Sequence, residues 1–418
     1  MALNYVWLAF FLIAFLVALI RLFMGDTQIF SQIMTGIFDS ARTGFDISIG
    51  LVGMMTLWLG IMKIGERAGM IQVFSRAVAP FFRKLFPSIP PGHPANGSIM
   101  MNFSANMLGL DNAATPLGLK AMKELQEINP EKETASNAQI MFLVLNTAGI
   151  TLIPTSVIAI RQSMAIEQGL TGFNPADIFL PTLIGTFVSF VSGMIAVAVY
   201  QRINLFRGPI FAFVGGFCAI MAILFLWLRQ YSPEDMALYI GLLGSLIIFS
   251  IIISFLVMGL IRRINVYEAF IEGAKDGFQT AITIIPYLIA ILVAISAFRT
   301  TGCMDYIVNG IGYFVAAMGL DTAFVPVLPV GLMKTLSGGG ARGLMVDVMK
   351  EYGVDSFQGY LASIIQGSTE TTFYVLAVYF GSVNIKKTRY ALTCGLIADL
   401  VGLVAAIIIA YLTFAGSR

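Results

Sequence analysis

Four clusters of hydrogen-bonding side chains interrupt a chain that is otherwise strongly apolar. They lie at residues 96–116, 146–155, 334–342 and 366–374 of a 418-residue sequence in which 58% of residues are hydrophobic and only 11% are charged. A polar side chain in hydrocarbon costs free energy unless it has a hydrogen-bond partner. Each cluster therefore predicts either a polar binding site or a tightly packed contact between helices.

The first cluster sets carboxamides, hydroxyls and one carboxylate among glycines and alanines, which let backbones approach closely. Its candidate binding residues are Asn102, Ser104, Asn106, Asp111, Asn112 and Thr115. One of the last three could cap a helix that begins at Pro116, with its positive end toward a solute. The alternative is an ordinary cap and loop at the membrane surface.

The second cluster contains Asn146, Thr147 and Thr151, followed by Pro154 and Thr155. The proline would break the helix and free backbone carbonyls. On a helix, residues 147, 151 and 155 would share one face. The alternative is packing between helices, because threonines hydrogen-bond to their own backbone in membranes.

The third cluster places Lys334, Ser337 and Arg342 around the glycine run 338–340. Three successive glycines disfavour a helix interior and predict a hairpin tip or a break between two half-helices. The order of residues is not that of a nucleotide-binding phosphate loop. Lys334 and Arg342 could neutralise a phosphate or a carboxylate, and the alternative is a solvent-exposed turn.

The fourth cluster lies in the middle of an apolar stretch, residues 358–380. Its candidate residues are Gln366, Ser368, Thr369, Glu370 and Thr371. A carboxylate within a membrane is a functional-site hypothesis by default. Glu370 could carry a coupling proton, hold a cation or bind a solute hydroxyl, or it could form a structural pair with Lys334 or Arg342.

Three aspartates, Asp46, Asp347 and Asp399, are weaker candidates. Asp46 and Asp399 lie near the ends of apolar stretches or among small residues.

About 20 apolar residues span a bilayer, and the mean hydropathy of +0.86 suits a membrane protein. The predicted spans are 3–24, 44–65, 137–160, 177–200, 208–229, 236–261, 278–298, 358–380 and 389–414. Two regions, 66–136 and 299–357, mix apolar residues with Gly, Pro, Asn and charges. Most of the 25 basic residues fall on one side if the N-terminus is cytoplasmic and the C-terminus outside.

The two irregular regions belong to an internal repeat. Residues 41–45 resemble 274–278, residues 121–124 resemble 348–351, and residues 146–151 lie opposite 366–371. Four spans per repeat and one linker span invert the second copy relative to the first. We therefore expect an all-α polytopic membrane protein with about nine transmembrane helices in two inverted repeats, each with a re-entrant hairpin and a broken helix.

Other classes of function have little support in the sequence. A net charge of +2 does not indicate nucleic-acid binding. The one histidine, His93, and three widely spaced cysteines do not form a metal motif. No nucleophile elbow or metalloprotease motif is found. We expect no cofactor, no metal centre, no nucleic-acid partner and no enzymatic activity.

Two motifs carry a family resemblance. Residues 106–122 resemble the signature of spore maturation protein A, and residues 366–374 resemble that of spore maturation protein B. The expected division is an A-like repeat at 1–200, a linker with one helix at 201–235 and a B-like repeat at 236–418. The resemblance implies a nucleoside-recognition gate domain, which concentrative nucleoside transporters and the ferrous iron transport protein B share, and a transporter-like fold with paired hairpins.

These observations favour a secondary transporter for a small polar solute, nucleoside-like or anionic, with one site built from all four clusters. Coupling to a proton or sodium ion through Glu370 is a further expectation. The alternatives are a non-transporting scaffold or assembly factor and, less favoured, a membrane-embedded enzyme. The expected location is the bacterial inner membrane, in contact with lipid, as a monomer or homo-oligomer.

Overall fold

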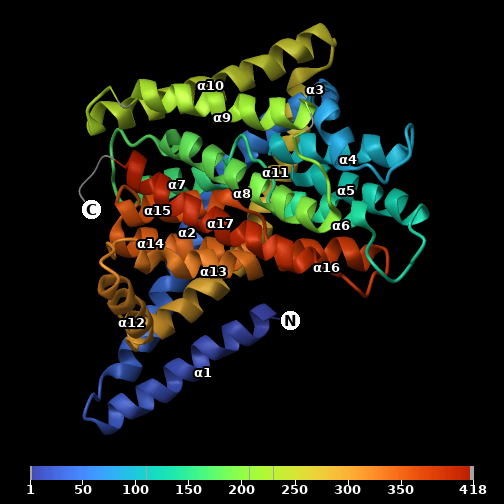
Figure 1. The fold of residues 1–418 in the computed structure, drawn as a ribbon. Coiled ribbons are helices and arrows are strands. Elements are labelled where there is room, and N and C mark those ends of the chain that lie inside the picture. Colours follow the sequence, from blue (N-terminus) through green and yellow to red (C-terminus); the bar gives the residue numbers. More distant parts are fainter. Residues whose placement is uncertain (1, 110, 207, 229, 415–418) are drawn as a thin grey trace.

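The computed structural model describes residues 2–109, 111–206, 208–228 and 230–414, and these form helices with no strand (Figure 1). Seven of the helices in these ranges are long and apolar enough to cross a membrane. They are α1 (Ala2–Phe23), α2 (Ile29–Arg67), α8 (Phe179–Gln201), α9 (Gly208–Leu228), α10 (Pro233–Ile261), α11 (Val266–Thr300) and α17 (Ala391–Thr413). The chain is thus a multi-pass, all-α membrane protein, as predicted.

The other two predicted spans are broken in the middle. Span 137–160 consists of α6 (Asn137–Thr147) and α7 (Thr155–Glu167). Span 358–380 consists of α15 (Phe357–Ser368) and α16 (Thr372–Ser382). Each half is too short to cross a bilayer alone. The expected broken helices are therefore present, one in each half of the chain.

Each of the two irregular regions folds into one short helix followed by a helical hairpin. The first region contains α3 (Met70–Leu85), α4 (Pro94–Met107) and α5 (Asp111–Glu127), and the second contains α12 (Cys303–Ala317), α13 (Leu328–Leu336) and α14 (Gly338–Tyr352). Short 3-10 turns, η1 (Pro175–Ile178) and η2 (Val325–Val327), precede α8 and α13. The order of the α-helices from α1 to α8 therefore matches the order from α10 to α17, with α9 between them.

Equivalent helices of the two repeats run antiparallel, as inversion requires. Gly44 of α2 faces Ile289 of α11, whereas Gly60 faces Phe270. The residue numbers rise along α2 as they fall along its partner. The second equivalent pair, α8 and α17, also runs antiparallel, because Gly193 faces Ala398 and Tyr200, seven residues further along α8, stacks on Tyr390.

Each repeat begins with a helix that packs on the other repeat. In the first repeat, α1 lies against α11, and the Trp7 indole donates to the Ala290 carbonyl at 2.9 Å. In the second, α10 lies against α2, where the Phe255 ring covers Gly65. The two repeats are therefore interleaved, while the limits of the predicted divisions at residues 200 and 236 stay a prediction.

Two glycines allow α2 and α11 to touch along their backbones. A Cβ atom on Gly273 would collide with the Leu59 carbonyl, and one on Gly277 would collide with the Met55 carbonyl. Small residues four positions apart are a common means of close packing between membrane helices. This contact holds the two repeats together beneath the hairpins.

Gly277→Ala should destabilise the protein, because the added methyl group must push the two backbones apart. Gly53→Ala on α2 is the matched control, since a Cβ there meets no atom within 4 Å and alanine favours a helix over glycine by about 1 kcal/mol. Thermal unfolding of the purified protein should show a lower Tm for Gly277→Ala and an unchanged or higher Tm for Gly53→Ala. A lower Tm for Gly53→Ala alone would contradict the assigned contact.

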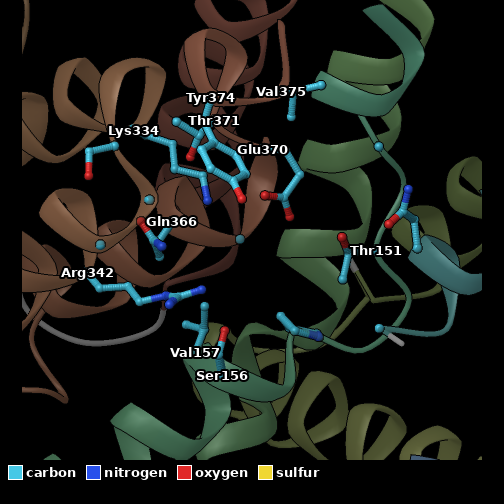
Figure 2. Close-up of a pocket in the computed structure, with 18 of the residues that line it drawn as sticks. Thr151, Ser156, Val157, Lys334, Arg342, Gln366, Glu370, Thr371, Tyr374 and Val375 are labelled. Carbon is cyan, nitrogen blue, oxygen red and sulfur yellow. The ribbon is translucent and has the colours of Figure 1, made fainter. Parts of the chain in front are cut away.

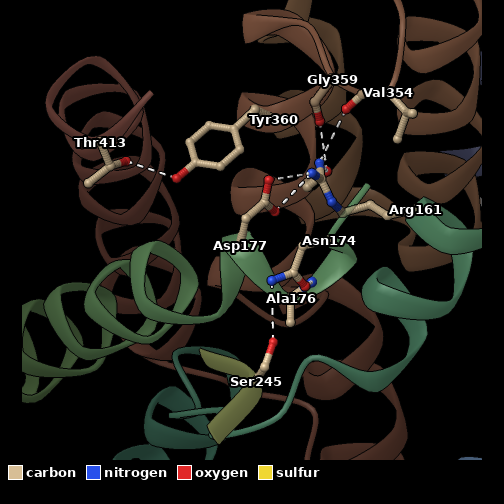
Figure 3. Close-up of polar contacts among 10 residues, drawn as sticks. Arg161, Asn174, Ala176, Asp177, Ser245, Val354, Gly359, Tyr360 and Thr413 are labelled. Carbon is tan, nitrogen blue, oxygen red and sulfur yellow. Dashed lines mark hydrogen bonds and ion pairs between the residues drawn. The ribbon is translucent and has the colours of Figure 1, made fainter. Parts of the chain in front are cut away.

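A buried arginine joins the broken helix of the first repeat to the second repeat (Figure 3). Arg161 of α7 is fully buried and donates to both carboxylate oxygens of Asp177 at 2.9 and 3.0 Å. It also donates to the Ser363 hydroxyl at 2.9 Å, and its guanidinium lies over the Phe173 ring. A paired guanidinium of this kind fixes geometry more than it adds stability.

Arg161→Met should lower the free energy of unfolding by about 3 kcal/mol, because it removes the buried guanidinium that pairs with the part-buried Asp177 carboxylate and donates to Ser363. Lys386→Met is the control, since the Lys386–Glu133 pair is largely exposed and such pairs contribute about 0–1 kcal/mol. Chemical denaturation of both variants in detergent measures the difference, and equal losses would show that Arg161 is not a structural anchor.

Candidate functional site

A cavity of about 660 Å³ lies between the two repeats where the broken helices and hairpins meet (Figure 2). Its volume is in the range of small-molecule binding sites. Thr151, Ser156 and Val157 enter it from the first repeat, and Lys334, Arg342, Gln366 and Glu370 enter it from the second. The site therefore belongs to neither repeat alone.

Ten of the predicted binding residues line this cavity, and they come from all four sequence clusters. They are Asn106, Thr115, Asn146, Thr151, Lys334, Ser337, Arg342, Gln366, Glu370 and Thr371. Polar residues that are up to 265 positions apart in the chain thus converge on one space. Their role in binding stays a prediction, but their convergence is a property of the fold.

Five predicted residues lie outside the cavity lining and are buried in the helix packing. They are Asn102, Ser104, Thr147, Ser368 and Thr369. Four of them, all except Thr369, donate to backbone carbonyls at 2.5–2.9 Å. The side chains of Asp111 and Asn112 lie outside the described part of the structure.

Three local details differ from the expectations. The helix of the first hairpin begins at Asp111, so Pro116 lies inside α5 and Thr115 is exposed in the cavity rather than acting as a cap. Thr147, Thr151 and Thr155 share no helix face, because residues 148–154 are not helical.

The third difference concerns the glycine run. The break between α13 and α14 falls at Ser337, and the three glycines form the first turn of α14. The Ser337 hydroxyl caps this turn by accepting from the Gly340 N–H at 3.0 Å. A first turn tolerates glycine because its N–H groups have no partner inside the helix.

The two broken helices are bonded to each other at their breaks. The backbone N–H of Glu370 donates to the Thr147 carbonyl at 2.8 Å. On the first repeat, the Leu152 N–H donates to the Met107 carbonyl at the hairpin tip at 2.9 Å. These bonds satisfy non-helical backbone that hydrocarbon could not solvate.

Carboxamide groups complete the link between hairpin and broken helix. The Asn106 side chain at the end of α4 donates to Asn146 Oδ1 at 2.8 Å, and Asn146 donates to the Phe142 carbonyl at 2.9 Å. Both asparagines therefore position the walls of the cavity.

The N-terminal ends of four helices, α5, α7, α14 and α16, contribute to the cavity lining. The lining residues lie within the first five positions of each helix: Ala114 and Thr115, Ser156, Gly338 and Gly339, and Tyr374 and Val375. Helix N-termini carry partial positive charge and free N–H groups. Their convergence makes the cavity favourable for an anionic or hydroxyl-bearing solute.

Three charged side chains lie at the cavity, and their surroundings differ. Lys334 is buried in the packing of α13, whereas Glu370 is exposed in the cavity. Arg342 extends into the open space (Figure 2). Within the described chain its guanidinium has no hydrogen bond or ion pair to another side chain, and its Nε atom is buried without a partner. Arg342 is thus a cation without a protein counter-ion.

A second cavity of about 250 Å³ adjoins the first between α2 and α11. Gly109, Thr155, Ser156, Ile284 and Arg342 line both cavities. The second cavity is also lined by Lys63, Glu66 and Asp276 near the end of α2. Arg342 therefore lies at the boundary between the two cavities.

Several lining residues were not among the predicted site residues. They are Thr155, Ser156, Thr283, Tyr287, Tyr374 and Tyr379. Thr283 and Tyr287 are spaced four apart around Pro286 in an apolar span, which is a weak signal that could have singled them out. Thr155 and Tyr374 end the second and fourth polar clusters, whereas Tyr379 lies in an apolar helix and gave no signal of its own.

A family model described as nucleoside recognition matches residues 48–164 and again residues 281–386. The first match runs from within α2 into α7, and the second runs from within α11 past α16. Each match therefore contains one hairpin and one broken helix. The chain belongs to the nucleoside-recognition (Gate) family.

Two curated relatives share this Gate family chain's sequence over nearly their whole length. Spore maturation protein A of Bacillus subtilis (strain 168) is 40% identical over 192 residues, which is 46% of this chain and 92% of the relative. Spore maturation protein B of the same organism is 48% identical over 164 residues, 39% of this chain and 90% of the relative. No solved structure matches the chain. The predicted resemblance to both proteins is confirmed.

Accessibility to a charged thiol reagent should separate the cavity from the packing around it. In a Cys218→Ser background, Thr151→Cys should react at least about ten times faster than Thr147→Cys, because only residue 151 lines the cavity and a thiolate must meet water to react. Mass spectrometry of the purified protein measures both rates. Similar rates would mean that the cavity is not hydrated.

Proposed function

We propose that this Gate family protein is a secondary transporter that carries a small polar solute through the central cavity. The observation that carries the proposal is a polar cavity at the meeting point of two inverted repeats, lined by the ends of broken helices from both. Inverted repeats with a midplane site between discontinuous helices suit alternating access, because one repeat can move against the other around a fixed site.

The solute chemistry that the lining favours includes a negatively charged group. Arg342 offers an unpaired guanidinium, a group that binds carboxylates and phosphates through bidentate hydrogen bonds. The four helix N-termini add partial positive charge on the same space. Glu370 would bind a hydroxyl or cationic group of the same solute, or carry a coupling proton. A compound with a carboxylate or phosphate at one end and hydroxyl or amino groups at the other fits these positions.

A nucleoside-like solute is the second candidate, and the family description favours it. Gln366 and Asn106 supply carboxamides that can pair with a base edge, and Tyr374 and Tyr287 supply aromatic surface. A neutral nucleoside would leave Arg342 without a counter-ion. We therefore rank the charged solute first.

The alternative functions fit the cavity less well. A scaffold or assembly factor would gain nothing from an open polar space with an unpaired cation, because such a group costs free energy. An intramembrane aspartyl enzyme would need two facing carboxylates. Of the three aspartates that could form such a pair, Asp46 is exposed and pairs with Arg42, Asp399 is buried in the packing of α17, and the side chain of Asp111 lies outside the described residues.

The second cavity, beside Arg342, supplies a route for the solute. It leads toward the C-terminal end of α2 and the N-terminal end of α11, where Lys63 contacts Glu66 and Glu272. The distribution of basic residues supports the proposal that this end faces the cytoplasm and that the C-terminus lies outside, in the bacterial inner membrane.

Thermal unfolding of the purified protein against nucleosides, amino acids, dipeptides, organic anions and phosphate esters should identify the solute class. A ligand that binds only the folded state raises the Tm by mass action. We expect carboxylates or phosphates to raise it, and Arg342→Gln to weaken their binding at least about tenfold, since a charged hydrogen bond contributes about 1.5–3 kcal/mol.

Arg83→Gln is the control, because Arg83 is an exposed arginine outside both cavities. It should bind the same solutes as the unmodified protein. Proteoliposomes should then take up the stabilising compounds in the same order of preference. Stabilisation without any uptake would reject transport and leave a binding protein.

A further inference from the structure

Asp399 is a buried carboxylate that the proposed solute site does not use. It lies on α17, is 6% exposed and does not line the central cavity. Its Oδ2 atom accepts from the Thr372 hydroxyl at 2.7 Å. Its Oδ1 atom is buried and has no hydrogen-bond partner within the described chain. A buried carboxylate oxygen without a partner costs several kcal/mol unless something positive meets it.

Two glycines on the same face of α17 bring hydroxyl groups around this carboxylate. Gly395 and Gly402 lie four residues before and three residues after Asp399, so all three share one helix face. A Cβ on Gly395 would lie 3.5 Å from Thr372 Oγ1 and 3.6 Å from Thr147 Oγ1.

Gly402 brings a second pair of residues to the same face. A Cβ there would lie 3.2 Å from Ser189 Oγ, with the Thr369 methyl group at 3.0 Å. Three hydroxyl groups, those of Thr147, Ser189 and Thr372, therefore lie along the face of α17 that carries Asp399. All three residues are fully buried.

Thr372 donates its proton to Asp399, whereas the other two hydroxyl groups present oxygen lone pairs to this face. Thr147 donates its proton to the Val144 carbonyl at 2.9 Å, and Ser189 donates to the Ala398 carbonyl at 3.0 Å. A hydroxyl that has donated its proton still has lone pairs to offer. The last turn of α15 also ends beside this face, and its carbonyls have no partner in their own helix. The surroundings of Asp399 are thus rich in oxygen and poor in donors.

Charged neighbours of Asp399 are few. Those acting on it are Lys334 on α13, which has the opposite charge, and Glu370 between α15 and α16, which has the same charge. Together with Asp399 and Arg342, these two side chains have a net charge of zero. An anionic solute alone would make the set negative, whereas an anionic solute together with one monovalent cation would restore neutrality.

We propose that Asp399, with the hydroxyl groups of Thr147, Ser189 and Thr372, forms a binding site for one sodium ion. One carboxylate surrounded by neutral oxygens suits a hard monovalent cation. The described residues contain no group of three His, Cys, Asp or Glu, which a transition metal would favour.

The sodium site is connected to the solute cavity through the second broken helix. Thr372 is the first residue of α16, and its two predecessors, Glu370 and Thr371, line the cavity. A cation on Asp399 would fix the start of α16 and so fix the two side chains that face the solute. On this basis, which rests on the proposed transport function, sodium and an anionic solute bind together and cross as a neutral pair.

The test measures sodium binding without any solute. The Tm of the purified protein is recorded in NaCl and in choline chloride at equal ionic strength and fixed pH. Sodium should raise the Tm of the unmodified protein in a saturable way. Asp399→Asn, which keeps the shape of the side chain, should abolish the rise. Asp46→Asn is the control and should keep it, because Asp46 is an exposed carboxylate that lines neither cavity.

A milder variant guards against misfolding of Asp399→Asn. Thr372→Val removes one oxygen ligand of the ion. The sodium concentration that gives half of the maximal rise in Tm should therefore increase about tenfold. No sodium effect, or one that persists in Asp399→Asn, would overturn the proposal. A stabilisation that follows pH and ignores sodium would also overturn it. Because no solute is added, these outcomes are independent of whether the solute screen succeeds.

Discussion

The structure depends on one constraint, which is that broken backbone inside a membrane must find its hydrogen bonds within the protein or in enclosed water. The chain meets it by placing the break of each long helix against the break of the other. The bond from the Glu370 N–H to the Thr147 carbonyl joins the two breaks directly. The hairpin tips then close around this junction, and the polar space that remains is the cavity. Its polarity is therefore a consequence of the breaks themselves.

The two repeats have the same shape but contribute different chemistry. The first gives mainly neutral groups, such as Asn106, Asn146 and Thr151, whereas the second gives the charged groups Lys334, Arg342 and Glu370. A symmetric fold thus surrounds an asymmetric site. Such an arrangement can hold a solute with two different ends in one orientation while the two halves of the protein move as equivalent bodies.

The sequence alone predicted the architecture, because long apolar runs mark the membrane spans and the order of motifs marks the repeat. Spans, repeat, hairpins and breaks are all local or periodic signals. Contacts between residues far apart in the chain could not be predicted in this way. The partner of Arg161 and the hydroxyl groups around Asp399 depend on how α7, α8, α15 and α17 pack, which no spacing records. Thr147 and Ser368 looked like site residues because their types are polar, but rotation of their helices turned them into the packing.

The interleaving of the repeats has a consequence for how the chain matures in the membrane. While α1 to α8 alone have been synthesised, the glycine face of α2 faces lipid, because α10 and α11, which cover it, follow later in the chain. The first half must therefore wait in a loosely packed state until the second half is inserted in the opposite orientation. Biogenesis then ends with a docking step inside the bilayer, and the cavity comes into existence only at that step.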